Sequence, residues 1–240
     1  MQARMIFSVF TISAASFAAT AGSVGYESPA TRGGSGDSIG MSFSGIAGGG
    51  GAGRVVVDGR TLPTGHIGFQ ITTGPSAGSQ FFTFCIELSQ NVGSGPAFYQ
   101  IVDLTQAPLP GPSYGSGTAD QISAVVANAV ALGWIDGRLQ SDTAQTNYLG
   151  RMGAIQAALW DAIGGSVDIN APETSASVRD AYMQLLDTTT FDSTLRLSGL
   201  RALTNSSRQD MLYVVPLPPA SLAGVGLMVA GLGIRAARRR

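Results

Sequence analysis

Apolar and polar positions change their spacing near the middle of the chain. Before residue 107, short segments rich in Val, Ile, Phe and Thr alternate with Gly and Pro turns, a pattern typical of β-strands. It predicts strands at about 39–43, 54–58, 66–72, 80–89 and 97–104. The first half of the chain is therefore expected to be rich in β-sheet.

After the loop at 107–117 the apolar residues follow a helical period. This spacing predicts helices over 118–135, 142–163 and 175–186, with Thr118 capping the first and Gly164-Gly165 ending the second. Strands are expected to return at 194–203 and 210–215. The predicted fold class is α+β, a β-rich sandwich or barrel with a helical insertion.

Charged residues make up 12% of the 240 residues, about half the share usual in soluble proteins. The formal net charge is -1, and all 14 basic residues are arginine. Without the two ends of the chain, nine arginines face 15 acidic residues. This composition excludes a disordered polyelectrolyte, and the acidic body is a poor candidate for binding nucleic acid.

The first 22 residues have the pattern of a secretory signal. Arg4 precedes an apolar stretch from Met5 to Phe17, and small residues follow where a signal peptidase could cut. A Gly/Ser-rich segment then runs from 23 to 53. It contains four consecutive glycines, but no GK[ST] follows them, so a phosphate-binding loop is the weaker alternative. The body of the protein is expected to span 54–215.

The last segment, 216–240, combines a proline motif, a short apolar span at 220–234 and a terminal arginine cluster. The span is shorter than the roughly 20 residues of a permanent membrane helix. The order of these parts resembles the PEP-CTERM sorting signals, most closely the VPLPA variant, through Val215-Pro216-Leu217-Pro218. Pro219 stands where that variant has Ala. The resemblance implies transient membrane insertion, processing by an exosortase-type enzyme in a Gram-negative bacterium, and release to the cell surface or extracellular matrix.

Cys85 is the only cysteine, so an exported chain of this sequence cannot form an internal disulfide. A buried thiol, an intermolecular cross-link, a nucleophile and a different covalent bond all remain open for it. Residues 81–88 alternate as a strand with two unlike faces. One face carries Phe82, Phe84, Ile86 and Leu88, and the other, more mixed face carries Phe81, Thr83, Cys85 and Glu87.

Gln156 and Trp160 are four residues apart in the second predicted helix and therefore share one helical face. Small alanines surround the glutamine and allow close approach of another segment. A glutamine at this position is expected to be partly buried, and a buried carboxamide needs hydrogen-bond partners.

The sequence Ile155-Gln156-Ala157-Ala158-Leu159-Trp160 resembles the TQxA-aliphatic-Trp motif of bacterial thioester domains. It matches at Gln156, Ala158, Leu159 and Trp160, and it has Ile155 where threonine is usual. These domains also carry a cysteine on a strand, which Cys85 would supply. The resemblance implies that a Cys85 thiolate attacks the carboxamide of Gln156, expels ammonia and leaves an internal thioester.

Such a bond would capture an amine or a hydroxyl on a surface or matrix partner, an exopolysaccharide among the candidates, and would act in adhesion or biofilm. Each molecule would react once, so no turnover enzyme and no cofactor are expected. Phe84 and Trp160 are the expected shields that keep water from the bond. The alternative is a passive structural matrix protein in which Cys85 and Gln156 only pack.

Two further sites come from the residues alone. His66, the only histidine, could pair with Cys85 in a hydrolase. Calcium could use acidic residues, although no D-x-D-x-D-G loop is present. The candidate calcium ligands are Asp58, Asp136, Asp161 and Asp168. Glu87 and Asp161 flank the reactive pair in sequence, and both are interpreted as solvated acids.

Overall fold

The strands pair into antiparallel sheets. The computed structural model describes residues 38–43, 53–74, 76–93 and 95–215. Within them, one sheet has the strand order β5-β4-β1-β6-β8-β9 and a smaller one the order β3-β2-β7. The strands are β1 (Ser38–Phe43), β2 (Gly53–Val57), β3 (Arg60–Thr64), β4 (Ile67–Ile71), β5 (Gln80–Thr83), β6 (Pro96–Val102), β7 (Val167–Asp168), β8 (Leu200–Asn205) and β9 (Arg208–Val214).

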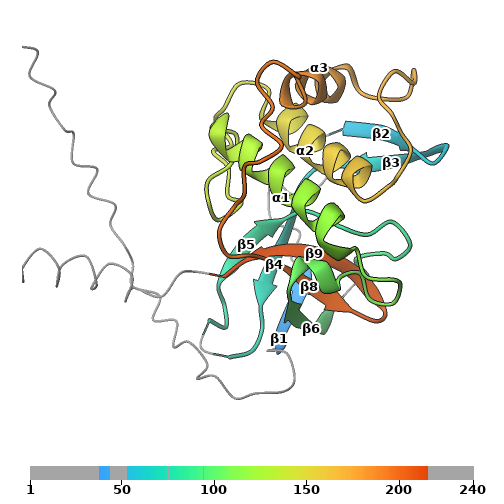
Figure 1. The fold of residues 1–240 in the computed structure, drawn as a ribbon. Coiled ribbons are helices and arrows are strands. Elements are labelled where there is room, and N and C mark those ends of the chain that lie inside the picture. The colour runs from blue at the N-terminus through green and yellow to red at the C-terminus, as the bar shows by residue number, and fades with distance from the viewer. Residues whose placement is uncertain (1–37, 44–52, 75, 94, 216–240) are drawn as a thin grey trace, which may run out of the picture.

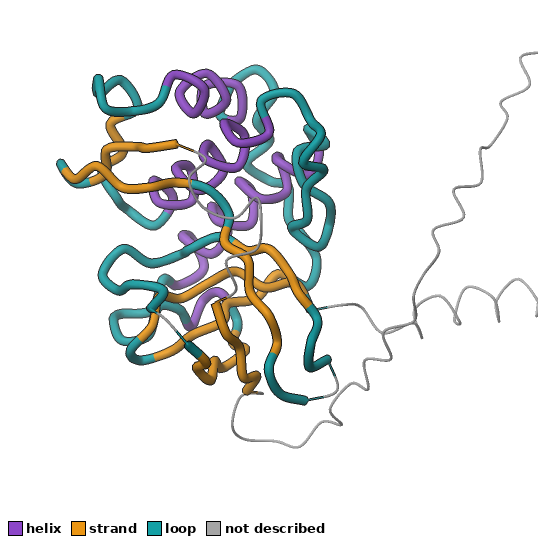
Figure 2. Tube along the Cα trace, turned by 180° about the vertical axis from the view of Figure 1, so that it is seen from behind, coloured by secondary structure: helices purple, strands orange, loops and turns teal. Residues whose placement is uncertain are grey.

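The helices form one block in the chain between β6 and β8, two strands that pair directly with each other. They are the 3₁₀ helix η1 (Leu104–Gln106) and the α-helices α1 (Gly115–Ala131), α2 (Tyr148–Ala162) and α3 (Ala176–Leu185). In Figure 1, α1 lies between the large sheet and a second layer made by α2, α3 and the β2–β3 hairpin. Figure 2 shows the same separation from behind. The mixed α+β class is confirmed.

The large sheet is not a closed barrel, so that part of the expectation is wrong. Its outer strands are β5 and β9. They do not pair along their length, and the chain beyond β5 forms one isolated antiparallel bridge to β9, Cys85 to Met211. Strand β5 ends at Thr83 rather than at residue 89, because from Phe84 onward the chain leaves β4 and turns toward β9.

Two groups of buried side chains hold the layers together. The helix-side cluster packs α1 and α2 on β8 and β9, and its members include Phe84, Ile86, Ile122, Val126, Ile155, Ala158, Leu159 and Leu212. The strand-side cluster consists of Val55, Val57, Phe69, Cys85, Tyr99, Ala157, Trp160, Leu203, Met211 and Tyr213. Helix α2 contributes to both clusters, because its small residues let neighbours approach it on two sides.

Other differences from the predicted elements have local causes. Strand β3 was not predicted because it contains Pro63, which only an edge strand tolerates, and β3 is an edge. Helix α2 begins at Tyr148 rather than 142, because the Asp142 carboxylate accepts the Ala144 N–H and holds a turn. Strand β8 begins at Leu200, and the residues before it pack on α1, where the Ser123 hydroxyl accepts the Leu197 N–H.

Helix α1 begins at Gly115, three residues before the expected cap at Thr118. The expected end of α2 at Gly164-Gly165 is confirmed, since the helix stops at Ala162 and both glycine N–H groups bond back to carbonyls of its last turn. At Gly165 a side chain would meet the Trp160 carbonyl oxygen at 2.9 Å and Leu88 Cδ1 at 2.8 Å.

Candidate functional site

Cys85 lies in the short segment that bridges β5 to β9. On either side of it, the Ile86 N–H donates to the Asp210 carbonyl (3.0 Å) and the Leu212 N–H donates to the Phe84 carbonyl (2.9 Å). The predicted alternation is confirmed from Phe84 to Ile86, since these two enter the helix-side cluster and Cys85 the strand-side cluster, but Leu88 also packs on the strand-side cluster because the chain has left the strand by then. In an antiparallel pair the N–H and C=O of one residue point to the same side, and those of its neighbours to the other. The main-chain groups of Cys85 therefore face away from β9.

Gln156 occupies that side. Its Oε1 accepts the Cys85 N–H at 2.8 Å, and its Nε2 donates to the Cys85 carbonyl at 2.8 Å. The glutamine side chain thus takes the place of a neighbouring strand and satisfies both groups in the interior. We call this pair of hydrogen bonds the Gln156 clasp. The structure brings together the two residues that the sequence singled out, although they are 71 positions apart.

A second glutamine contacts the sulfur. The Cys85 thiol donates to Gln209 Oε1 at 3.1 Å, and Gln209 Nε2 donates to the Glu87 carbonyl at 2.6 Å. The Gln209 N–H is bonded to the Asn91 carbonyl at 3.1 Å, so both ends of this residue are anchored. Gln209 is not among the residues predicted from the sequence, because a residue at the start of a returning strand carries no local signal that it faces a cysteine 124 positions away.

Two buried acids lie beside the cysteine. Glu87 is buried, so its interpretation as a solvated acid is wrong. Its carboxylate accepts the Ser89 hydroxyl and, at 3.4 Å, the Asp210 N–H. Asp210 accepts the N–H groups of Leu109 (2.7 Å) and Asn205 (2.9 Å). Burial, with a smaller contribution from Glu87, raises the pKa of Asp210 to about 7.

The surroundings keep the thiol protonated. Burial and, secondly, the charge of Glu87 raise the pKa of the Cys85 thiol well above its usual range. The expected attack by a free thiolate is therefore disfavoured in these surroundings.

The two expected shields lie on different sides. Trp160 belongs to the strand-side cluster with Cys85, whereas Phe84 belongs to the helix-side cluster, as does the motif residue Ala158. Within the residues that the structure describes, the buried indole N–H of Trp160 has no hydrogen-bond acceptor. Ala157 lies beside Trp160 in the strand-side cluster and lets α2 approach the cysteine closely.

His66 is buried, and its Nε2 is hydrogen-bonded to the Tyr148 hydroxyl at 2.7 Å. Its ring stacks on Phe82 with the centroids 4.2 Å apart. The Cys85 thiol donates to Gln209 instead of to a histidine nitrogen. These contacts give His66 a packing role between β5 and α2 and do not form the dyad that a hydrolase would need.

The acids considered for calcium do not converge. Across the described ranges, no three His, Cys, Asp or Glu side chains form a group that could hold a metal ion. Asp136 and Asp168 accept main-chain N–H groups in local turns, and Asp58 accepts the N–H of the distant Ser166 at 2.9 Å. Asp161 accepts the Tyr182 hydroxyl at 3.1 Å.

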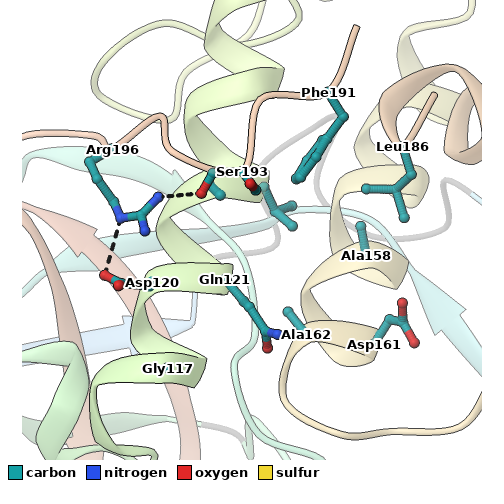
Figure 3. Close-up of a pocket in the computed structure, with 12 residues that line it drawn as sticks. Gly117, Asp120, Gln121, Ala158, Asp161, Ala162, Leu186, Phe191, Ser193 and Arg196 are labelled. Carbon is teal, nitrogen blue, oxygen red and sulfur yellow. Dashed lines mark hydrogen bonds and ion pairs between the residues drawn. The ribbon is translucent and has the colours of Figure 1, made fainter. Parts of the chain in front are cut away.

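A cavity of about 390 Å³ opens between α1, α2 and the chain that leads to β8. Figure 3 shows Phe191 and Leu186 on one side of it and the ion pair of Arg196 with Asp120 (3.1 Å) on the other. Helix α2 turns Ala158 toward this cavity. Residues two apart on a helix point in nearly opposite directions, so the cavity and Gln156 are on opposite sides of α2.

The ends of the chain fall mostly outside the described residues, among them the secretory signal, the span at 220–234 and Pro216-Leu217-Pro218 of the sorting motif. Val215 is described, and its N–H donates to the Gly199 carbonyl at 3.0 Å. In the described part of the chain, no helix is long and apolar enough to cross a membrane. Comparison of the chain with protein-family models, curated proteins and solved structures gives no match. Function is therefore inferred from the residues of the site.

Proposed function

We propose that the protein forms an internal thioester between Cys85 and Gln156 and uses it to attach covalently to a surface or matrix partner. The observation that carries this proposal is the Gln156 clasp. It holds a carboxamide against the only cysteine of the chain, with both residues buried. The clasp bonds the carboxamide to the main chain of the same residue that carries the thiol, so the two groups need no long-range encounter before they react.

The clasp also supports the chemistry of bond formation. The Cys85 N–H already donates to Gln156 Oε1, the atom on which negative charge develops when sulfur adds to the carbonyl carbon. The Sγ–Cδ bond forms, the Cδ–Nε2 bond breaks, and the thiol hydrogen goes to Nε2, which leaves as ammonia. Because the thiol supplies its own hydrogen to the leaving ammonia, no other side chain has to donate or accept a proton. The dry surroundings then protect the product from hydrolysis.

In the reaction with a target, the sulfur of Cys85 becomes the leaving group. An amine or hydroxyl adds to Cδ, the Cδ–Sγ bond breaks, and a hydrogen returns to the sulfur. The thiol that leaves is regenerated, but the Gln156 acyl group stays on the target. Each molecule reacts once, and the absence of lysine leaves the body with no side-chain amine to compete.

We further propose that the protein is exported and sorted to the cell surface or matrix. The leader at 1–22 and the resemblance of 215–240 to PEP-CTERM signals support this, with an exosortase-type enzyme as the processing partner. An exopolysaccharide or another matrix component would then supply the amine or hydroxyl. The finer description of the fold, a β-rich thioester-type domain over 54–215, belongs to the same proposal.

Intact mass of the purified full chain tests the thioester. Loss of ammonia predicts a deficit of about 17 Da, and methylamine should add about 31 Da to that species and free one thiol. Cys85→Ala is the matched control, because the clasp uses only main-chain atoms of residue 85 and survives the substitution. A wild-type protein of unshifted mass with a titratable thiol would contradict the proposal.

The same clasp favours one alternative, a passive structural protein. Two satisfied main-chain groups are sufficient reason for a buried glutamine at this position. In that case Cys85 stays a buried thiol and the exported protein acts in the matrix through its fold. The mass measurement separates the two functions, since only the thioester loses ammonia.

A further inference from the structure

The acceptor atom of Gln209 changes its partner when the sulfur is acylated. In the free thiol state, Oε1 of Gln209 accepts the Cys85 S–H at 3.1 Å. A thioester sulfur carries no hydrogen, so this buried oxygen then faces the bond without a donor from Cys85. Gln209 cannot turn away easily, because its Nε2 is bonded to the Glu87 carbonyl and its N–H to the Asn91 carbonyl. A buried acceptor that has lost its donor costs free energy until another donor reaches it.

The position of Gln209 indicates where that donor would come from. Gln209 is 9% exposed, against 4% for Cys85 and 1% for Gln156. Of the three residues it is therefore the nearest to solvent, at the start of β9 beside the β8–β9 turn. Helix α2 lies behind Gln156 on the other side of Cys85. Strand β9 is an outer strand of the large sheet.

We propose that Gln209 receives and holds the target nucleophile when it opens the thioester. This inference rests on the proposed function. An N–H of an incoming amine, or the O–H of a sugar, donates to Gln209 Oε1 and so places its nitrogen or oxygen beside the acyl sulfur. The nucleophile then adds to Gln156 Cδ, the Cδ–Sγ bond breaks, and one hydrogen passes from the nucleophile to the sulfur. The restored S–H donates again to Gln209. The same oxygen thus accepts a hydrogen bond from the nucleophile before the reaction and from the thiol after it.

The experiment compares two nucleophiles on the full chain. Methylamine has hydrogens to donate, whereas the thiolate of 2-mercaptoethanol has none on its sulfur. In Gln209→Leu the mass deficit of about 17 Da should persist, methylamine should open the bond about tenfold more slowly, and the thiolate rate should stay unchanged. Gln209→Glu, which keeps an acceptor oxygen, should react with methylamine at least as fast as the wild type.

A nearby glutamine provides the control. Gln90 Nε2 donates to the carbonyls of Leu109 and Ser206 close to the same turn and has no hydrogen bond to the sulfur. Gln90→Leu should therefore leave both rates unchanged.

Equal slowing of both nucleophiles in Gln209→Leu, or a methylamine rate equal to that of the wild type, would overturn the inference. Loss of the mass deficit in both Gln209 variants would also overturn it, because Gln209 would then act in bond formation or folding. A wild-type chain that shows no deficit refutes the proposed function itself, and the two failures are thus distinguished.

Discussion

The substitution Cys85→Ala gives very different losses of stability with and without a cross-link. The Gln156 clasp bonds only to main-chain atoms of residue 85, so alanine preserves it. A bond between residues 71 positions apart restricts the unfolded chain and would contribute about 4 kcal/mol by the loop-entropy relation for disulfides. In a wild type without the cross-link, the substitution removes only the buried sulfur and its hydrogen bond to Gln209, which contributes about 1 kcal/mol. A thioester sulfur donates no such bond, so we expect a loss of about 4 kcal/mol for a cross-linked wild type and about 1 kcal/mol otherwise.

Urea unfolding of the two proteins, followed by circular dichroism, measures this difference. A cross-linked wild type should also show a smaller dependence of its unfolding free energy on urea, since its unfolded state exposes less surface. A difference of only about 1 kcal/mol with equal slopes would refute the cross-link.

A second substitution in the Cys85→Ala background isolates the clasp. Gln156→Leu keeps the volume of the side chain but leaves the N–H and C=O of residue 85 without partners in the interior. Each unpaired group costs about 1–3 kcal/mol, so we expect a further loss of about 4 kcal/mol. A loss below about 1 kcal/mol would show that the clasp is not formed in solution.

Three further predictions concern neighbouring groups. Because the folded protein holds the Asp210 proton more tightly than the unfolded chain, with a pKa of about 7 against an ordinary 3.8, stability should fall as pH rises from about 4 to about 7 and then level off. The fall should be on the order of 2 kcal/mol, and Asp210→Asn should flatten the profile in urea unfolding at several pH values; an unchanged slope would contradict this. Trp160→Phe removes an indole N–H that has no acceptor among the described residues, so it should cost about 1 kcal/mol in thermal unfolding, and a loss above about 3 would indicate a hidden partner. His66→Gln keeps a group that can bond to the Tyr148 hydroxyl and should leave methylamine reactivity unchanged, whereas a hydrolase using His66 with Cys85 would lose its activity.

Two features of the site could be predicted because each follows from the periodicity of a single strand or helix. The alternation of residues 81–88 placed Phe84 and Cys85 on opposite faces, and the helical spacing placed Gln156 beside Trp160 on α2. Both assignments are correct because each follows from the period of one element. The expectation that a buried glutamine finds partners also follows from its chemistry alone.

The rest depends on contacts between distant segments. The early end of β5 follows from competition between β4 and β9 for the same chain, which no local pattern reports. The burial of Glu87 and its contact with Gln209 have the same origin, since Gln209 and Asp210 of β9 both donate hydrogen bonds to Glu87. Phe84 was expected to shield the sulfur, but a side chain on the opposite face of a strand packs into a different cluster.

Locating the acylated residue tests the central claim most directly. The full chain would be treated with isotopically labelled methylamine, digested, and sequenced by fragmentation in a mass spectrometer. The thioester account predicts one labelled residue, N-methylglutamine at Gln156, with Gln209 unmodified and no label in Cys85→Ala. Absence of label from the wild type, or label at Gln209 instead of Gln156, would contradict the account.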